Sequence, residues 1–479
     1  MRALGRVPAP LAALLAATAL LGIAWALVVP VAQSPDEPSH FAYAQVLAER
    51  GKRPLPDDTR RRQTTQSTEQ QLARERSHQE WVFAEPRVRP EWRTRVFRRW
   101  QAEHARLPAS AREDGGGPNS ASGNPPVYYA YEALAYHAAG RGHFFARWFG
   151  MRIWSAMLLL VAVGATWLLV GELTRRDRLL QLAGAACVGL QPMATFVSAS
   201  INPDAAQIAL WALALWLGVV LLRRPATRGV VAGLVAVTLL ALLTKATSLA
   251  LLPALGLVAV VAGRRELRGR DVRWRRWAPA VAVAGVALLG AGALAARRVD
   301  SSLVGGLGDL RGFASYLWQA YLPNLPFQER IEGLAAFAGY DLWVKSAWAA
   351  FGWLEVQFHE PVYIVLAAVS GLLLGGGAVA AARGRLAVDR AVAAFFALAV
   401  LVLAAGLHWT DYRQFLDQGQ SFVQGRYLLP LLPIAGVAAA GAVSLLPRRR
   451  RGVAVALLLG GLVTLQLFSL GITVGRFYA

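Results

Sequence analysis

The chain has 479 residues, of which 56% are hydrophobic and 16% are charged. Soluble globular proteins contain about 45–50% apolar and about 25% charged residues, so this composition excludes a cytosolic globular enzyme and a disordered chain. The 50 Lys and Arg residues outnumber the 29 Asp and Glu residues and give a net charge of +21, and the single cysteine, Cys187, excludes an intrachain disulfide and a cysteine metal cluster. The apolar residues gather in long Leu, Ala and Val runs, which indicates a polytopic membrane protein.

Runs of about 20 apolar residues, the length that crosses the hydrocarbon core, predict eleven transmembrane helices. In chain order they cover 10–31, 149–171, 179–200, 205–222, 229–243, 248–263, 278–296, 361–382, 389–407, 427–446 and 452–474. The stretch 229–263 is interrupted by Thr244 and Lys245, so we expect either a tight pair of helices or one broken helix there. The first run is too long for the hydrophobic part of a signal peptide, and we expect an uncleaved anchor.

The arginines predict the orientation of these helices. With a cytoplasmic N-terminus, the loops on the cytoplasmic side carry 22 Lys and Arg residues, whereas the short segments on the outer side carry four. Cytoplasmic loops of membrane proteins are rich in Lys and Arg, so the basic excess indicates topology and excludes a nucleic-acid partner. The preference for Arg over Lys and the abundant Ala suggest a bacterial source, so we expect a multi-pass protein of the bacterial plasma (inner) membrane.

Two long segments, 33–148 and 297–360, are predicted to lie outside the membrane. The expected organisation in chain order is a first transmembrane helix (1–32), the first outer segment (33–148), helices two to seven (149–296), the second outer segment (297–360) and helices eight to eleven (361–479). Within the first outer segment, 60–113 is polar with helical periodicity, and Gly115–Asn124 is expected to be a flexible linker. The Tyr-rich stretch Pro125–Gly140 is only half apolar, which favours a helix lying at the membrane surface over a crossing helix.

The first candidate site lies directly after the first predicted helix, in "QSPDEPSHFAYA". Asp36 and Glu37 stand between two prolines, which restrict the backbone, and His40 follows one helical turn later. Two acids and a histidine on a stiff turn suit a divalent cation site or a general base. The alternative is an ordinary helix N-cap, and the pattern alone does not decide between the two.

Three further candidates lie on the same predicted outer side. Asp204 lies in the short turn between the third and fourth helices, where an acid costs several kcal/mol unless it has a partner; its alternative role is again helix capping. Lys245 interrupts the apolar stretch in "LLTKATSL", and Arg426 begins the tenth helix in "QGRYLLPLLP". Cations at such positions can hold a phosphate or diphosphate, or they can simply extend toward lipid headgroups.

Weaker candidates lie in aromatic stretches and are more typical of interfacial anchors or of a sugar-binding surface: Tyr340, Asp341, Lys345, Trp353, Glu355, His359, Glu360, Trp409, Asp411, Tyr412 and Asp417. The sequence contains no P-loop, no nucleotide-binding glycine motif, no G-x-S-x-G and no Cys/His metal pattern. ATP-driven pumping and hydrolysis of the soluble type therefore have no support.

Several motifs, in the order in which they occur, resemble a known family: "SPDEPSHFAYA", "NPPVYYAYEAL", "RIWSAMLLLVAVGATWLLVGELTRR", "SASINPDA", "LLTKATSLALLP", "FGWLE" and "GRYLLPLLP". Together they resemble the bacterial membrane family named domain of unknown function 2142, over most of the chain. That family in turn resembles GT-C-type glycosyltransferases, which take sugars from polyprenyl-phosphate carriers. The resemblance implies an all-α, GT-C-like polytopic bundle.

The resemblance also implies roles for the candidate residues. Asp36, with Glu37, would be the catalytic base or a metal ligand, and Asp204 would be a supporting ligand. Lys245 and Arg426 would hold the lipid-linked phosphate, with His40 and Tyr427 as further substrate-binding residues. The cofactor compatible with these acids is a divalent cation, Mg²⁺ or Mn²⁺, bound by Asp36, Glu37 and Asp204.

We therefore expect a membrane glycosyltransferase that moves a sugar from a polyprenyl-phosphate donor to a glycan, lipid or protein acceptor of the cell envelope. A transporter or flippase of lipid-linked sugars is the first alternative, but the paired repeats common in transporters are not evident in the sequence. A non-catalytic envelope scaffold, with 60–113 as its docking surface, is the second alternative.

Overall fold

The structure is a computed structural model that describes residues 7–56, 66–77, 92–140, 143–268, 309–335, 337–419 and 424–479. The predicted helix 278–296 and parts of the segment 60–113 lie outside these residues. Among them, eight helices are long and apolar enough to cross a membrane, or nine if one bent pair is counted as a single span. The all-α, polytopic class is confirmed, but the predicted number of eleven spans is not.

Six of the eight spans are uninterrupted α-helices: α1 (Ala9–Val28), α7 (Phe144–Leu173), α10 (Asp204–Arg223), α17 (Glu360–Ala382), α18 (Arg390–Gln418) and α20 (Arg448–Tyr478). The other two begin with a 3-10 turn that continues into an α-helix: η3 (Ala246–Leu251) with α12 (Leu252–Arg268), and η6 (Gly425–Leu431) with α19 (Leu432–Ser444). Both 3-10 turns follow a residue with extended backbone, Lys245 and Gln424.

Two predicted spans differ from single crossing helices. Residues 179–200 form α8 (Arg178–Gly189) and α9 (Pro192–Ser198), which are bent by 57° relative to each other. The bend follows from Pro192, which cannot continue α8, and from Gln191, whose side chain caps α9 by accepting the Ala194 N–H. In 229–263, α11 (Arg228–Leu242) is short and ends before Lys245, which confirms the expected pair with a break at this lysine.

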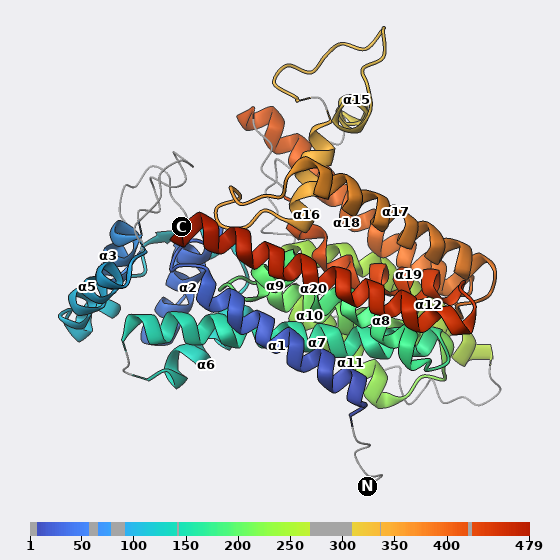
Figure 1. Cartoon of the computed structure of the whole chain (residues 1–479), viewed down its shortest axis with the longest axis horizontal. Coiled ribbons are helices and arrows are strands. Elements are labelled where there is room, and N and C mark those ends of the chain that lie inside the picture. The colour runs from blue at the N-terminus through green and yellow to red at the C-terminus, as the bar shows by residue number, and fades with distance from the viewer. Residues whose placement is uncertain are drawn as a thin grey trace.

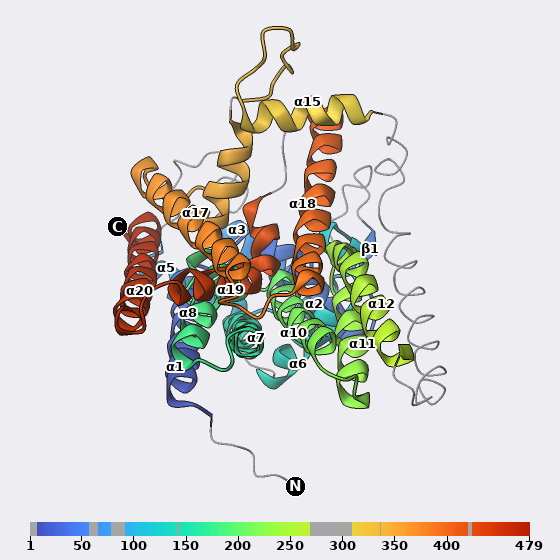
Figure 2. The ribbon, with the colours of Figure 1, turned by 90° about the vertical axis from the view of Figure 1, so that its right-hand side faces the viewer.

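The helices pack around α7, which contacts α1, α8 and α10, while α19 contacts α8 and α17 (Figures 1 and 2). α10 lies almost wholly inside the bundle, whereas α17 and α20 leave most of their apolar side chains uncovered. Leu372 of α17 is 74% exposed and Leu457 of α20 is 71% exposed. Such a continuous apolar outer surface is typical of helices that face lipid.

The arginine-rich turns meet at one end of the bundle, which we call the arginine-rich end. There Arg224 pairs with Glu172 at 2.6 Å, Arg265 donates to the carbonyl oxygen of Leu222 at 3.0 Å, and Arg451 lies 3.5 Å from Asp177. At the opposite end α1 leads into α2 (Glu37–Arg50), beside the C-terminus of the chain (Figure 1).

The first outer segment packs on this opposite end. Beyond α2 it contains β1 (Leu55–Pro56), α3 (Thr68–Arg76), α5 (Thr94–Ala105), η1 (Ala109–Arg112), β2 (Pro118–Asn119), η2 (Ser120–Gly123) and α6 (Val127–Ala138). α3 and α5 confirm helices within 60–113 where the structure describes it, and α6 is a 12-residue helix outside the candidate spans. The prediction of a flexible linker at Gly115–Asn124 is wrong, because β2 pairs with β1 and the Asn119 amide donates to the Ser39 carbonyl oxygen at 3.0 Å.

An aromatic core joins α2 and α6 to the start of α7. The rings of Tyr43 and Tyr129 stack with centroids 3.7 Å apart, and those of Phe41 and Trp148 stack at 4.5 Å. In the second outer segment, α15 (Leu310–Tyr321) lies across the end of α18 (Figure 2), and η5 (Tyr340–Lys345) and α16 (Ser346–Trp348) precede α17. These outer elements hold the loops at the ends of the spans in fixed positions.

Candidate functional site

A buried ion pair fixes the turn that carries Asp36. The Glu37 carboxylate accepts two hydrogen bonds from the Arg152 guanidinium of α7, at 2.7 and 2.6 Å, and both side chains are fully buried. Arg152 also donates to the carbonyl oxygens of Ala26 and Pro30 at the end of α1. Asp36 then enters α2 with a left-handed backbone, at a φ of 62°. Because Arg152 holds the Glu37 side chain, the side chain of the neighbouring Asp36 is free to point toward a different residue, Arg426.

The same carboxylate ties down the turn that carries Asp204. Glu37 accepts the backbone N–H of Ile201 at 3.2 Å, and the Asn202 side chain accepts the N–H of Asp204 at 2.9 Å. Asp204 is the first residue of α10 and its side chain is only 4% exposed. The two acid-bearing turns, 168 positions apart in the chain, therefore have a fixed spacing.

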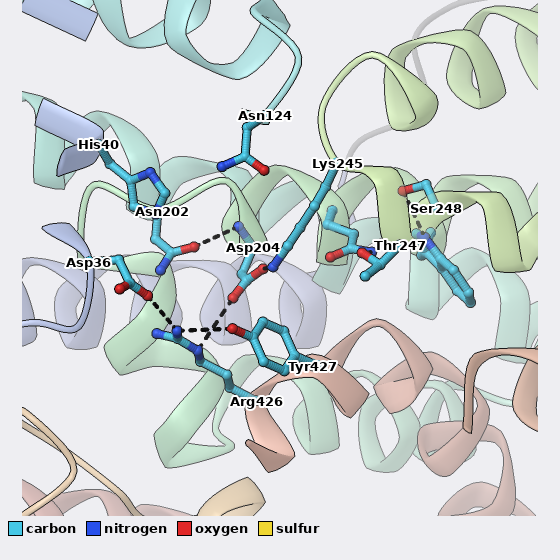
Figure 3. A network of polar contacts seen from close by, with 12 residues as sticks. Asp36, His40, Asn124, Asn202, Asp204, Lys245, Thr247, Ser248, Arg426 and Tyr427 are labelled. Carbon is cyan, nitrogen blue, oxygen red and sulfur yellow. Dashed lines mark hydrogen bonds and ion pairs between the residues drawn. The ribbon is translucent and has the colours of Figure 1, made fainter. Parts of the chain in front are cut away.

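Lys245 and Arg426 complete a cluster that we call the Asp–Lys–Arg site (Asp36, Asp204, Lys245 and Arg426; Figure 3). The Lys245 ammonium pairs with the Asp204 carboxylate and lies 4.3 Å from the centroid of the Tyr427 ring. The Arg426 Nη2 donates to Asp36 at 2.6 Å, and the Arg426 Nε lies 3.8 Å from Asp204. Two acids and two cations from four separate parts of the chain thus form one network.

Arg426 owes its position to the glycine before it. A Cβ on Gly425 would lie closer than 3.0 Å to the Trp343 carbonyl oxygen and to the Ala347 nitrogen, so only glycine fits against α16 here. The Gly425 N–H also donates to the Ser346 hydroxyl at 2.7 Å. These contacts press the start of η6 against α16 and direct the Arg426 side chain into the site.

Arg426 is buried but not fully satisfied. Its side chain is 2% exposed, and its Nη2 donates to Asp36 and, at 3.2 Å, to the Tyr427 hydroxyl. Its Nε and Nη1 make no hydrogen bond with any residue that the structure describes. Buried guanidinium groups in native proteins usually have partners for their donors, so these two unused donors make Arg426 a candidate anion-binding group.

Electrostatics keep Asp36 ionised. Burial raises the pKa of its carboxyl, but the charge and hydrogen bond of the Arg426 guanidinium, together with the charges of His40 and Lys245, outweigh burial and hold the pKa below its usual range. The Asp36 side chain is 44% exposed, in contrast to the other acid of the site. Asp36 is therefore a charged carboxylate that a substrate can approach.

His40 belongs to a neighbouring uncharged network. The Asn124 amide donates to the Tyr129 hydroxyl at 3.1 Å, and the Tyr129 hydroxyl is 2.9 Å from the His40 Nδ1. Since the Tyr129 oxygen accepts from Asn124, its O–H is free to donate to Nδ1, which leaves the His40 proton on Nε2. Burial lowers the pKa of His40 to about 4, so the imidazole is neutral at pH 7.

The structure brings together most of the residues that the sequence predicted for the site. Asp36, Asp204, Lys245, Arg426 and Tyr427 are in direct contact through the network of Figure 3, and His40 lies beside it. Glu37 needs correction. Although it follows Asp36 in sequence, its carboxylate is bound by Arg152 and does not join the two aspartates.

The predicted metal ligands Asp36, Glu37 and Asp204 do not form a cation site. Among the described residues, no group of three or more His, Cys, Asp or Glu side chains is arranged to hold a metal ion. Asp36 already pairs with Arg426, and Asp204 pairs with Lys245, so each carboxylate has a cation of the protein beside it. A divalent cation would have to displace these partners, and the donor set does not fit it.

The weaker candidates form contacts of their own. Lys345 pairs with Asp341 at 2.6 Å and with Glu360 at 2.5 Å, and Glu355 lies 3.6 Å from Arg476. Further contacts join Trp353 to the Ala32 carbonyl oxygen, Asp411 to the Tyr316 hydroxyl and Tyr412 to Asp309. These contacts hold the second outer segment to the turn after α1 and to α17, α18 and α20.

Sequence reasoning missed Arg152, Tyr129 and Asn124. Arg152 is an ionisable residue inside a predicted span, which is a signal for a buried partner. Asn124 lies in the predicted linker and Tyr129 in the predicted surface helix. The hydrogen bonds that join Asn124 to Tyr129 and Tyr129 to His40 have no local sequence signature.

Comparison with solved structures gives two similar folds. The chain is similar to ArnT from Cupriavidus metallidurans in its apo state, with a TM-score of 0.42 and 16% identity, over 92% of this chain and 61% of that one. It is also similar to the apo form of the Archaeoglobus fulgidus oligosaccharyltransferase, with a TM-score of 0.44 and 12% identity, over 97% of this chain and 56% of that one. The chain thus spans less than two thirds of the length of either structure.

Comparison at the level of sequence identifies the family. There is no significant match among curated proteins. Residues 19–435 match the family described as "Predicted membrane protein (DUF2142)", and this range contains all four residues of the Asp–Lys–Arg site. The match confirms the family resemblance noted in the sequence motifs. The chain belongs to the DUF2142 family of membrane proteins.

Proposed function

We propose that this protein is a membrane glycosyltransferase that moves a sugar from a polyprenyl-phosphate donor to a hydroxyl group of a glycan, lipid or protein acceptor. The observation that carries the proposal is the Asp–Lys–Arg site itself. It combines a half-exposed carboxylate, Asp36, with two cations, one of which has unused N–H donors. Transfer from a phosphate leaving group needs both a base and positive charge, and the two lie side by side here.

The position of the site suits a donor anchored in lipid. Asp204, Lys245 and Arg426 lie at or next to the first residue of the candidate spans Asp204–Arg223, Ala246–Glu266 and Gly425–Ser444. The ends of such spans lie near the headgroups of a bilayer, where the phosphate of a polyprenyl carrier also resides. The arginine-rich end is opposite, so the preference of Arg for the cytoplasm favours a site at the outer face of a bacterial plasma membrane.

Each residue has a distinct task in this reaction. Asp36 accepts the proton of the acceptor hydroxyl while the oxygen of that hydroxyl attacks the anomeric carbon of the sugar. The bond between that carbon and the phosphate oxygen breaks, and its electron pair leaves with the phosphate. Lys245 and Arg426 stabilise the charge of the departing phosphate, and Asp204 keeps Lys245 in place. No step requires a metal ion.

The test is a transfer assay with the purified full-length protein, labelled polyprenyl-phosphate sugars and membrane acceptors. Asp36→Asn should lower transfer by about 100-fold or more, because the base is lost while the shape is kept. Glu172→Gln, which neutralises an acid at the arginine-rich end, serves as the matched control and should transfer normally. Full activity of Asp36→Asn would refute the role of Asp36.

The same assay separates the enzyme from a flippase of lipid-linked sugars. A flippase needs the phosphate contacts of Lys245 and Arg426 but no base. If the wild-type protein moves labelled lipid across vesicle membranes without forming a sugar–acceptor product, and Asp36→Asn does so equally well, the glycosyltransferase proposal fails.

A further inference from the structure

We infer that the Asp36 carboxylate occupies the place of the donor phosphate on Arg426 until a donor binds, and that the incoming phosphate displaces it. The inference deepens the proposed function and rests on it for the identity of the anion. It makes Asp36 the counter-ion of Arg426 in the absence of a donor, and a free base only when the donor is present.

The geometry of the guanidinium carries the first step. Arginine binds phosphate best through two parallel N–H donors, either Nε with Nη2 or Nη1 with Nη2. Nη2 belongs to both pairs, and in this structure it donates to Asp36 at 2.6 Å and to the Tyr427 hydroxyl at 3.2 Å. The unused donors are Nε and Nη1. A phosphate that takes two parallel donors must therefore take an Nη2 proton from one of these partners.

Of the two partners on Nη2, Asp36 gives way, because a phosphate competes with a carboxylate for the same cation, whereas Tyr427 is neutral and Lys245 lies 4.3 Å from its ring centroid. The side chains of Arg426 and Asp204 are 2% and 4% exposed, whereas that of Asp36 is 44% exposed. Asp36 thus lies on the open side of Arg426, and an anion arriving from that side meets Asp36 first. The inner acid, Asp204, keeps its own partner, since Lys245 pairs with it and rests against the Tyr427 ring.

Charge favours the exchange. Two anions beside one guanidinium repel each other, and the half-exposed Asp36 carboxylate regains its hydration when it leaves, while the phosphate takes over the charge of the buried Arg426. Once Arg426 binds the phosphate, Asp36 loses the cation that lowers its pKa. The released carboxylate becomes a stronger base at the moment when a donor is in place. Without a donor, Asp36 stays bound to Arg426.

Binding measurements test the displacement without reference to transfer. The probe is decaprenyl phosphate added to the full-length protein in lipid nanodiscs, with decaprenol and inorganic phosphate in separate arms. Asp36→Asn removes the competing charge, and asparagine tolerates the left-handed backbone of this position. We expect decaprenyl phosphate to bind about threefold to tenfold more tightly, the value of a half-exposed pair, while decaprenol binding does not change. Asp36→Ser, a second neutral variant, should tighten binding similarly.

A double variant distinguishes displacement from a general loss of negative charge. In an Arg426→Gln background the contested group is absent, so Asp36→Asn should no longer tighten binding. The inference is overturned if both neutral variants bind decaprenyl phosphate as the wild type does or more weakly, or if the tightening persists without Arg426. If the neutral variants also bind inorganic phosphate more tightly, the site recognises phosphate itself. If they bind only decaprenyl phosphate more tightly, the lipid is required for binding. Both results support displacement.

The outcome is separable from that of the proposed function. Tighter phosphate binding by Asp36→Asn together with no sugar transfer by the wild-type protein would leave the displacement standing and remove the glycosyltransferase. If the wild type transfers sugar normally, and Asp36→Asn loses transfer without binding phosphate more tightly, the glycosyltransferase stands and the displacement is overturned.

Discussion

The buried pair of Glu37 and Arg152 is the structural support of the site, and its disruption gives the sharpest prediction about stability. In Glu37→Gln the Arg152 guanidinium loses its counter-ion while both side chains remain fully buried. Breaking such a pair from one side costs about 3–5 kcal/mol, because a charge is left uncompensated away from water. Arg152 keeps its carbonyl acceptors at Ala26 and Pro30, so we expect the lower end, about 3 kcal/mol.

The neighbouring acid provides the comparison. Asp36→Asn leaves the buried Arg426 with a second acid, Asp204, 3.8 Å from its Nε, and with an amide oxygen that can still accept from its Nη2, so the cost should be well below that of Glu37→Gln. Replacing both members of the buried pair with apolar residues, as in Glu37→Leu with Arg152→Met, should recover much of the loss, because no charge then remains buried. Two adjacent acids are therefore predicted to differ widely in their effect on stability.

The single cysteine allows a direct assay. Cys187 is partly buried in α8, and a thiol-reactive fluorescent dye labels it faster once the bundle opens. On heating, Glu37→Gln should be labelled at a clearly lower temperature than the wild type, Asp36→Asn close to the wild type, and the double variant in between. Equal labelling temperatures for Glu37→Gln and Asp36→Asn would show that the Glu37–Arg152 pair does not support the turn as we describe.

Three further predictions concern the site and its surroundings. Burial lowers the pKa of His40 to about 4, from about 6.5 in the unfolded chain, so the stability that neutral His40 contributes is complete above pH 6.5 and declines as the pH falls toward 4. Acidification from pH 7 to 5 should therefore lower the free energy of unfolding by about 2 kcal/mol. The variant His40→Gln should lose less stability over the same range in thermal melts. Gly425→Ala should move Arg426 and weaken decaprenyl phosphate binding by about tenfold, whereas Gly460→Ala, where a Cβ meets nothing within 4 Å, should bind normally. Since the two aspartates already have cations of the protein as partners, a chelator should leave decaprenyl phosphate binding unchanged, and strict dependence on Mg²⁺ or Mn²⁺ would contradict the pairing described.

The sequence predicts the bundle well where a span is a single apolar run, but not where a span is interrupted. Pro192 lies in the middle of 179–200, and only the structure shows that the bend there is 57°. By contrast, the break near Lys245 is visible in the sequence, because a lysine in an apolar stretch needs a special environment. The first outer segment is harder to predict, since its order depends on distant contacts such as that of Asn119 with Ser39.

For the site, the sequence identifies the residue types and predicts that they lie at one end of the bundle, but it does not predict the directions of their side chains. Asp36 and Glu37 are adjacent acids with the same local signals, and successive side chains at the start of a helix point about 100° apart. Which of the two faces the site depends on Arg152, which lies 115 positions away from Glu37. Ion pairs between distant segments leave no local pattern, so the separate roles of the two acids emerge only from the structure.

The most direct test of the central claim is an experimental structure of the full-length protein with decaprenyl phosphate bound in a lipid nanodisc. We predict the phosphate within hydrogen-bond distance of the Arg426 guanidinium and the Lys245 ammonium, with the Asp36 carboxylate turned away from Arg426 and open to the acceptor side. A phosphate bound elsewhere on the bundle, with Asp36 still paired to Arg426, would contradict the claim that these residues form the donor site.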